Sequence, residues 1–83
     1  SKEAMTMIMD LDVHGMVVEE AIAHIEKAIK KAPKDVEAIR VIHGYNSGSA
    51  LKKAIQDPNG IRSKRLVRRK FTANQGETIL VID

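Results

Sequence analysis

The stretch Leu11-Asp12-Val13-His14-Gly15 ends an alternating apolar run and is followed by an amphipathic segment. A second apolar run ends in the same way at Ile42-His43-Gly44, and an amphipathic segment again follows it. If the two runs are parallel strands joined by a helix, both histidines leave the sheet at one edge, because parallel strands share their carboxyl ends. Open α/β sheets bind ligands at that edge. The sequence therefore predicts one site built from two distant segments.

The spacing of apolar residues around these segments predicts the other elements. Residues 5–13 alternate as a strand does, whereas the apolar residues of 18–32 recur at the period of a helix, which Pro33 ends. The expected strands are 5–13, 36–43, 61–71 and 78–82, and the expected helices are 18–32 and 49–56. The fold class is therefore α/β, with a β-α-β-α-β-β order in a single domain that covers residues 1–83.

Composition narrows the class of protein. The chain has 83 residues, 43% of them hydrophobic and 30% charged, which is typical of one globular domain. No apolar stretch approaches the roughly 20 residues that span a bilayer, so we expect no membrane partner. The lack of cysteine excludes disulfides and zinc sites of the finger type. Because an alternating segment follows Ser1-Lys2-Glu3-Ala4, we expect no signal peptide and a cytoplasmic location. The start at Ser1 without methionine indicates a processed tag or a domain excised from a larger protein.

Positive charge is concentrated near the end of the sequence. The formal net charge is +3, and residues 61–83 carry six Lys or Arg against two Asp or Glu. Because arginine is a good bidentate phosphate ligand, this cluster predicts nucleic-acid contact, although charges also protect edge strands from aggregation. Tyr45 and Phe71 are the only aromatic residues, so base stacking contributes little. The clustered cations are Arg62, Lys64, Arg65, Arg68, Arg69 and Lys70.

The first His-Gly segment contains a candidate acid-base pair. Asp12 and His14 are two residues apart, so on a strand they point to the same side. A carboxylate beside an imidazole orients the ring for general acid or base catalysis. The alternative is structural, with Asp12 capping the following turn and His14 bonding a backbone carbonyl.

The second segment contains a candidate phosphate loop. Two glycines and Ser47 precede the predicted helix at 49–56, which begins with Ser49. Exposed backbone N–H groups at a helix start favour anions. The loop lacks the Gly-Lys-Ser/Thr of a Walker motif and the spacing of a dinucleotide fingerprint. A plain strand-to-helix turn, with His43 packed at its base, is the alternative. The candidate binding residues are Gly44, Tyr45, Asn46, Ser47 and Gly48.

Together the two segments resemble the Smr (small MutS-related) domain family. Its marks are Leu-Asp-x-His-Gly, found here at 11–15, then Val-Glu-Glu-Ala, found at 18–21, and a strand that ends in His-Gly with further glycines, found at 39–48. The resemblance implies a two-layer sandwich like the C-terminal domain of translation initiation factor 3, with two helices on one face of a four-stranded mixed sheet. Two departures are Asn46, where the family pattern has glycine, and Val17, where a capping Thr or Ser is common.

The same resemblance implies nucleic-acid binding, and in several members an endonuclease that nicks DNA or cleaves RNA. Asp12 and His14 fall on the positions implicated in cleavage, while His43, Gly44 and Gly48 fall on the loop thought to hold the phosphate backbone. We therefore expect an endonuclease, which acts on phosphodiester bonds as a hydrolase or a transferase and needs no cofactor.

Two questions stay open: whether cleavage needs a metal ion, and whether the domain cleaves nucleic acid at all. In a metal-free reaction, His14 acts as base or acid, Asp12 orients it and His43 is the opposite catalytic partner. In a metal route, Asp12 and His14 are the ligands and Asp10 adds a further one. A binding module without catalysis and a protein-interaction adaptor are the alternatives to an enzyme.

Overall fold

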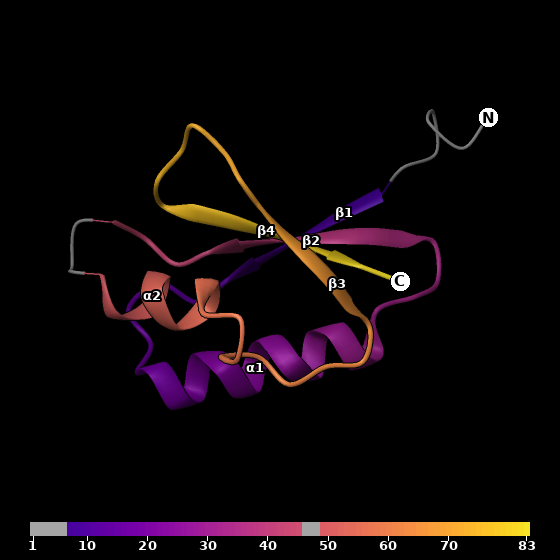
Figure 1. Cartoon of the computed structure of the whole chain (residues 1–83), viewed down its shortest axis with the longest axis horizontal. Coiled ribbons are helices and arrows are strands. Elements are labelled where there is room, and N and C mark those ends of the chain that lie inside the picture. The colour runs from indigo at the N-terminus through magenta and orange to yellow at the C-terminus, as the bar shows by residue number, and fades with distance from the viewer. Residues whose placement is uncertain (1–6, 46–48) are drawn as a thin grey trace.

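The computed structural model describes residues 7–45 and 49–83 of the chain. In chain order the elements are β1 (Met7–Asp12), α1 (Val18–Lys31), β2 (Val36–Ile42), α2 (Ala50–Gln56), β3 (Leu66–Phe71) and β4 (Glu77–Ile82) (Figure 1). The β-α-β-α-β-β order expected from the sequence is confirmed. Neither helix in the described ranges is long and apolar enough to cross a bilayer.

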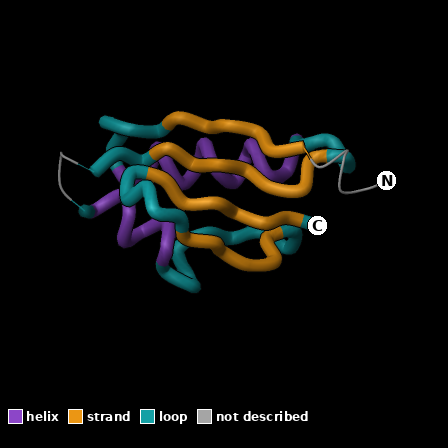
Figure 2. Tube along the Cα trace, turned by 90° about the horizontal axis from the view of Figure 1, so that it is seen from above, coloured by secondary structure: helices purple, strands orange, loops and turns teal. Residues whose placement is uncertain are grey.

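The four strands form one mixed sheet in the order β1-β2-β4-β3. β1 pairs with β2 in parallel, and β4 pairs antiparallel with both β2 and β3. Figure 2 shows the strands side by side, with the helices behind them. The predicted sandwich, with two helices on one face of a four-stranded mixed sheet, is therefore confirmed.

The hydrophobic core lies between the sheet and the helices. α1 buries Ala21, Ile25 and Ile29, which recur at helical spacing on one side. Full burial of a side chain such as isoleucine stabilises the fold by roughly 1.5–3 kcal/mol. The sheet and α2 complete the core with fully buried Ile39, Val41, Ile55 and Leu80.

The opposite face of the sheet is open. Strand residues alternate between the two faces, so Met9 and Leu11 of β1 pack against the core while Asp10 and Asp12 lie on the open face. The register places Asp10 beside Arg40 of β2. The first His-Gly segment therefore leaves β1 with its carboxylates on the uncovered side of the sheet.

The stretch before β3 differs from the sequence prediction. A strand is expected from residue 61, but β3 begins at Leu66. Ile61 is buried in the core, and the backbone N–H of Arg62 donates a 2.7 Å hydrogen bond to the Glu26 carboxylate on α1. Because these contacts hold residues 61–65 against α1, that stretch does not join the sheet, and this part of the prediction was wrong.

Candidate functional site

The two His-Gly segments meet at the carboxyl ends of β1 and β2. The backbone N–H of Val13 donates a 2.9 Å hydrogen bond to the carbonyl of Ile42. Gly44 has a φ of 82°, a left-handed conformation that suits glycine. A Cβ atom added to Gly44 would lie 3.4 Å from the Cβ of His14. The fold thus brings His14 and Gly44 side by side from distant parts of the sequence.

Asp12 and His14 form a pair at this edge. Nδ1 of the His14 ring lies 2.5 Å from Oδ1 of Asp12, and the backbone N–H of His14 donates to the same oxygen at 3.0 Å. The side-chain hydrogen bond, followed by the backbone one, lowers the pKa of Asp12 below its ordinary value of 3.8. Because an ionised carboxylate only accepts hydrogen bonds, Nδ1 is the ring nitrogen that carries the proton.

The ring of His14 is open to solvent. The side chain of His14 is 68% exposed and that of Asp12 is 53% exposed. In the part of the chain that the structure describes, Nε2 of His14 has no hydrogen-bond partner. With Nδ1 protonated, the neutral ring presents its lone pair at Nε2. The pair is therefore arranged as an oriented general base at an open edge of the sheet.

His43 has the opposite environment, since it is only 4% exposed. Its Nδ1 lies 2.9 Å from the carbonyl oxygen of Gly44, and its Nε2 lies 2.9 Å from the hydroxyl of Thr78. The Gly44 carbonyl only accepts, so Nδ1 donates to it and Nε2 accepts from the Thr78 hydroxyl. That hydroxyl accepts in turn from the Gln56 amide at 3.1 Å. Both ring nitrogens of His43, expected as the catalytic partner of His14, thus have partners inside the domain.

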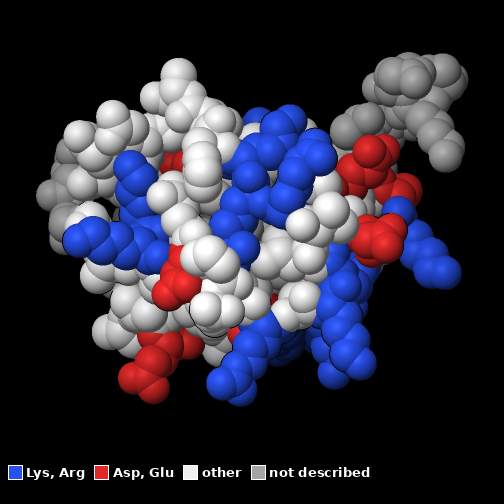
Figure 3. Space-filling view, viewed as in Figure 1, with Lys and Arg blue, Asp and Glu red and all other residues white. Residues whose placement is uncertain are grey.

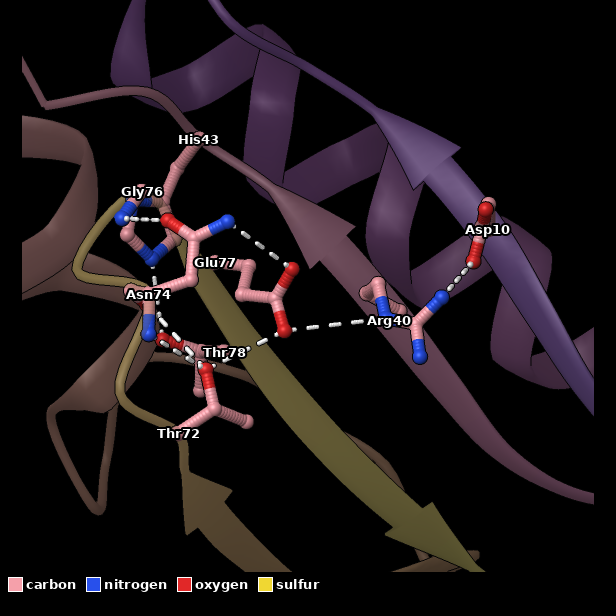
Figure 4. Close-up of polar contacts among 8 residues, drawn as sticks. All are labelled: Asp10, Arg40, His43, Thr72, Asn74, Gly76, Glu77 and Thr78. Atoms are coloured by element: carbon pink, nitrogen blue, oxygen red, sulfur yellow. Dashed lines mark hydrogen bonds and ion pairs between the residues drawn. The ribbon is translucent and has the colours of Figure 1, made fainter.

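The carbonyl of Gly76 holds the backbone of the second segment in place. It accepts hydrogen bonds from the backbone N–H groups of His43 and Gly44, each at 3.0 Å. The N–H of Gly76 donates at 2.8 Å to the side-chain oxygen of Asn74 in the turn between β3 and β4 (Figure 4). This turn therefore fixes where Gly44 lies beside His14.

Glu77 ties that turn to the open face of the sheet. Its carboxylate accepts from the Thr72 hydroxyl at 3.1 Å and from the Asn74 amide at 3.4 Å. Arg40 lies between two carboxylates, with Nε 3.6 Å from Glu77 and a terminal nitrogen 3.1 Å from Asp10 (Figure 4). Asp10, the additional ligand of a metal route, is thus paired with a cation. Across residues 7–45 and 49–83, no group of three His, Cys, Asp or Glu side chains is arranged to hold a metal ion.

The match to a known family covers both His-Gly segments. The family model of the Smr domain matches residues 11–78. The chain belongs to the Smr family. The crystal structure of the Smr domain of Thermus thermophilus MutS2 has the same fold, with a TM-score of 0.76 and 24% sequence identity over 90% of this chain and 98% of that one. No curated protein matches this chain.

Two arginines of the basic cluster stabilise the helices of this Smr domain. The guanidinium of Arg65 donates to the carbonyls of Ile29 and Ala32 at 2.6 and 2.9 Å, at the end of α1. Arg69 donates at 2.7 Å to the carbonyl of Ile55 in the last turn of α2. Cations at helix carboxyl ends satisfy free carbonyls and interact favourably with the helix dipole. Both arginines, expected as nucleic-acid ligands, therefore have structural contacts.

The other cations of the cluster divide between two surfaces. Arg68 and Lys70 of β3 pair with Val81 and Ile79, so they lie on the open face, and Figure 3 shows Lys and Arg side chains gathered over β3. Arg62 and Lys64 belong to the loop against α1 and are exposed. The cluster is therefore not one continuous patch.

The candidate phosphate loop is described only at its ends. Gly44 is half-buried and Tyr45 is 59% exposed, whereas Asn46, Ser47 and Gly48 lie outside the described residues. Nζ of Lys52 lies 5.9 Å from the centre of the Tyr45 ring. This lysine, which sequence reasoning missed, adds a positive charge beside the loop.

Sequence reasoning also missed Asn74, Gly76 and Thr78. The Asn-x-Gly spacing at 74–76 indicates a turn, but it does not say which segment the turn contacts. Thr78 reads as an ordinary β-branched strand residue, and its contact with His43 joins positions 35 residues apart. A polar residue on the inward side of an otherwise apolar strand is the one signal that the sequence offered.

The Asp12–His14 contact predicts how Asp12 titrates. In the folded protein, the carboxyl should titrate below pH 3.8, and His14→Ala should raise its pKa because the larger of two hydrogen bonds is lost. A lowered native pKa stabilises the fold above the unfolded value, and this contribution disappears as pH falls through the native pKa. NMR titration of the Asp12 carboxyl measures both values. An unchanged Asp12 pKa in His14→Ala would contradict the pairing.

The buried network around His43 predicts a stability change. Thr78→Val keeps the shape of the fully buried side chain but leaves Nε2 of His43 without its donor. The expected loss is about 1–3 kcal/mol of unfolding free energy. Val67→Thr makes the reverse exchange at an exposed position of β3 and serves as the control, with an expected change of about 0.5 kcal/mol or less. Urea denaturation compares the two, and equal stability of Thr78→Val and wild type would refute the network's role.

Proposed function

We propose that this Smr domain binds a nucleic acid and cleaves its phosphodiester bonds, with His14 as the reacting base. Smr domains generally bind nucleic acid, and some are nucleases. The observation that carries the proposal is the state of His14, whose Nδ1 is fixed by Asp12 while the ring stays 68% exposed beside Gly44. A single oriented base of this kind contributes about 10²–10⁴-fold to a proton-transfer rate.

In the proposed reaction, Nε2 of His14 removes the proton from the attacking hydroxyl, either water or a ribose 2′-OH. The hydroxyl oxygen forms a bond to phosphorus, the bond from phosphorus to the leaving oxygen breaks, and that oxygen takes a proton from solvent. Asp12 stabilises the imidazolium that forms, since its carboxylate already accepts from Nδ1. Exposed Arg68 and Lys70 attract the phosphate backbone from the open face.

We assign His43 a positioning role in this proposal. Its burial and its contacts with Gly44 and Thr78 leave no free ring nitrogen for a substrate. His43 instead fixes the carbonyl of Gly44, while the Gly76 carbonyl fixes the N–H of Gly44.

The protein is proposed to act in the cytoplasm.

A nucleic-acid-binding module without cleavage is the second candidate. The observation that favours it is the occupied ring of His43, because the second acid-base group expected at this edge is committed to the fold. Such a module would use the same exposed cations and would bind more weakly as salt increases.

The test is to incubate the purified domain with single-stranded RNA and with supercoiled DNA, with and without EDTA. We expect His14→Ala to lower the cleavage rate about 10²–10⁴-fold, because the proton acceptor is lost. Asp12→Asn should also lower it, since an amide does not fix the Nδ1–H tautomer in the same way. His24→Ala is the matched control, because this exposed histidine lies on α1, and its rate should equal that of wild type.

The outcomes separate the candidates. Undiminished cleavage by His14→Ala would refute the catalytic assignment. Binding without cleavage by the wild-type domain would favour the binding module. Loss of activity in EDTA, restored by a divalent cation, would replace the metal-free reaction with a metal-dependent one. If the wild-type domain neither binds nor cleaves nucleic acid, the protein-interaction role is the candidate that remains.

A further inference from the structure

A groove of about 660 Å³ lies between α1 and the loop before β3. α1 contributes Lys27 and Lys30, and the loop contributes Arg62, Lys64 and Arg65, so five cations line it. Glu26 is the one carboxylate among its lining residues. Figure 3 shows positive side chains below the sheet, where the loop passes α1 in Figure 1. This groove is separate from the His14 edge.

The fold holds both walls of this groove in place. Ile61 anchors the start of the loop in the core, and the N–H of Arg62 donates to Glu26 of α1. The guanidinium of Arg65 is held by the carbonyls at the end of α1. The loop therefore cannot swing away from α1 without losing these contacts, and the groove is formed before any ligand binds.

The positive charge of the groove is largely uncompensated. None of Lys27, Lys30, Arg62 and Lys64 forms an ion pair within the described residues. The Glu26 carboxylate already accepts a 2.7 Å hydrogen bond from the backbone of Arg62. Like charges gathered in a groove repel one another and produce a positive potential that attracts polyanions. The ligand chemistry that fits is a chain of phosphates.

The open face of the sheet is a poorer binding surface for a chain of phosphates. Its cations on β3 lie across the sheet from Asp10 and Asp12 on β1, and Arg40 is already shared between Asp10 and Glu77. The groove has four cations without an ion pair within the described residues, whereas β3 places Arg68 and Lys70 on the open face.

We propose that the groove between α1 and residues 61–65 holds the backbone of the same nucleic acid that reaches His14. This inference rests on the proposed function. A second hollow shares Ala23, Glu26 and Arg62 with the groove and continues along α1 to Val18, four residues after His14. Glu19 and Glu26 line this hollow, so the phosphates are held in the groove itself. From Val18 to Lys30 the helix rises about 18 Å, the length of about five phosphates along one strand of a duplex. A short oligonucleotide therefore spans both places.

The experiment measures binding of a labelled single strand of about 12 nucleotides, as RNA and as DNA, over a range of salt concentrations. Lys27→Gln with Lys30→Gln removes two groove cations. Lys31→Gln with Lys34→Gln is the matched control, since it removes the same charge from exposed positions that do not line the groove. Each lost phosphate contact should lower the slope of log affinity against log salt by about 0.7, so the groove variant should lose about 1.4 and the control nothing.

Each result decides between the two proposals. An equal slope in the groove variant, the control and the wild type would overturn the groove while nucleic-acid binding stands. No salt-dependent binding by the wild type would overturn both. Binding and cleavage are measured separately on the same oligonucleotide, which keeps a failure of catalysis distinct from a failure of the groove.

Discussion

The parallel pairing of β1 with β2 is the constraint on which the rest of the site depends. α1 returns the chain so that both strands end at one edge, where Val13 and Ile42 are joined by a 2.9 Å hydrogen bond. Leu11 and Val41 pair on the inward face and hold this register. A slip of one residue would turn Asp12 toward the core. The position of His14 beside Gly44 thus follows from apolar packing several residues away.

The same chain uses similar side chains for different purposes, and their surroundings determine which. His14 is exposed and ends in a free nitrogen, whereas His43 is buried and joins β2 to α2 and β4 through Thr78. Arg69 reaches a helix carbonyl, while its neighbours on either side in β3 lie on the open face, because alternate strand residues point in opposite directions. Positive charge near the candidate site is therefore not all available to a ligand.

Much of the fold was predictable from local patterns, because the strands and α1 have clear periods and the two His-Gly segments mark the strand ends. The role of His43 was not predictable, since it depends on Thr78, 35 residues later. The alternation of strand residues by itself predicts that Arg68 and Arg69 point to opposite faces of the sheet. The contact of Arg65 with α1 was hidden because residues 61–65 read as strand and instead form a loop that Ile61 anchors. Long-range contacts, rather than local preferences, account for these differences.

The proposed general base depends on Asp12, which holds the neutral ring of His14 with its proton on Nδ1. NMR of the ¹⁵N-labelled domain, at a pH where His14 is neutral, distinguishes the two ring nitrogens by their chemical shifts. We expect a protonated Nδ1 and an unprotonated Nε2 in the wild type, with a mixture of both forms in Asp12→Asn. A neutral His14 protonated at Nε2 in the wild type, or a tautomer that does not change in Asp12→Asn, would contradict it.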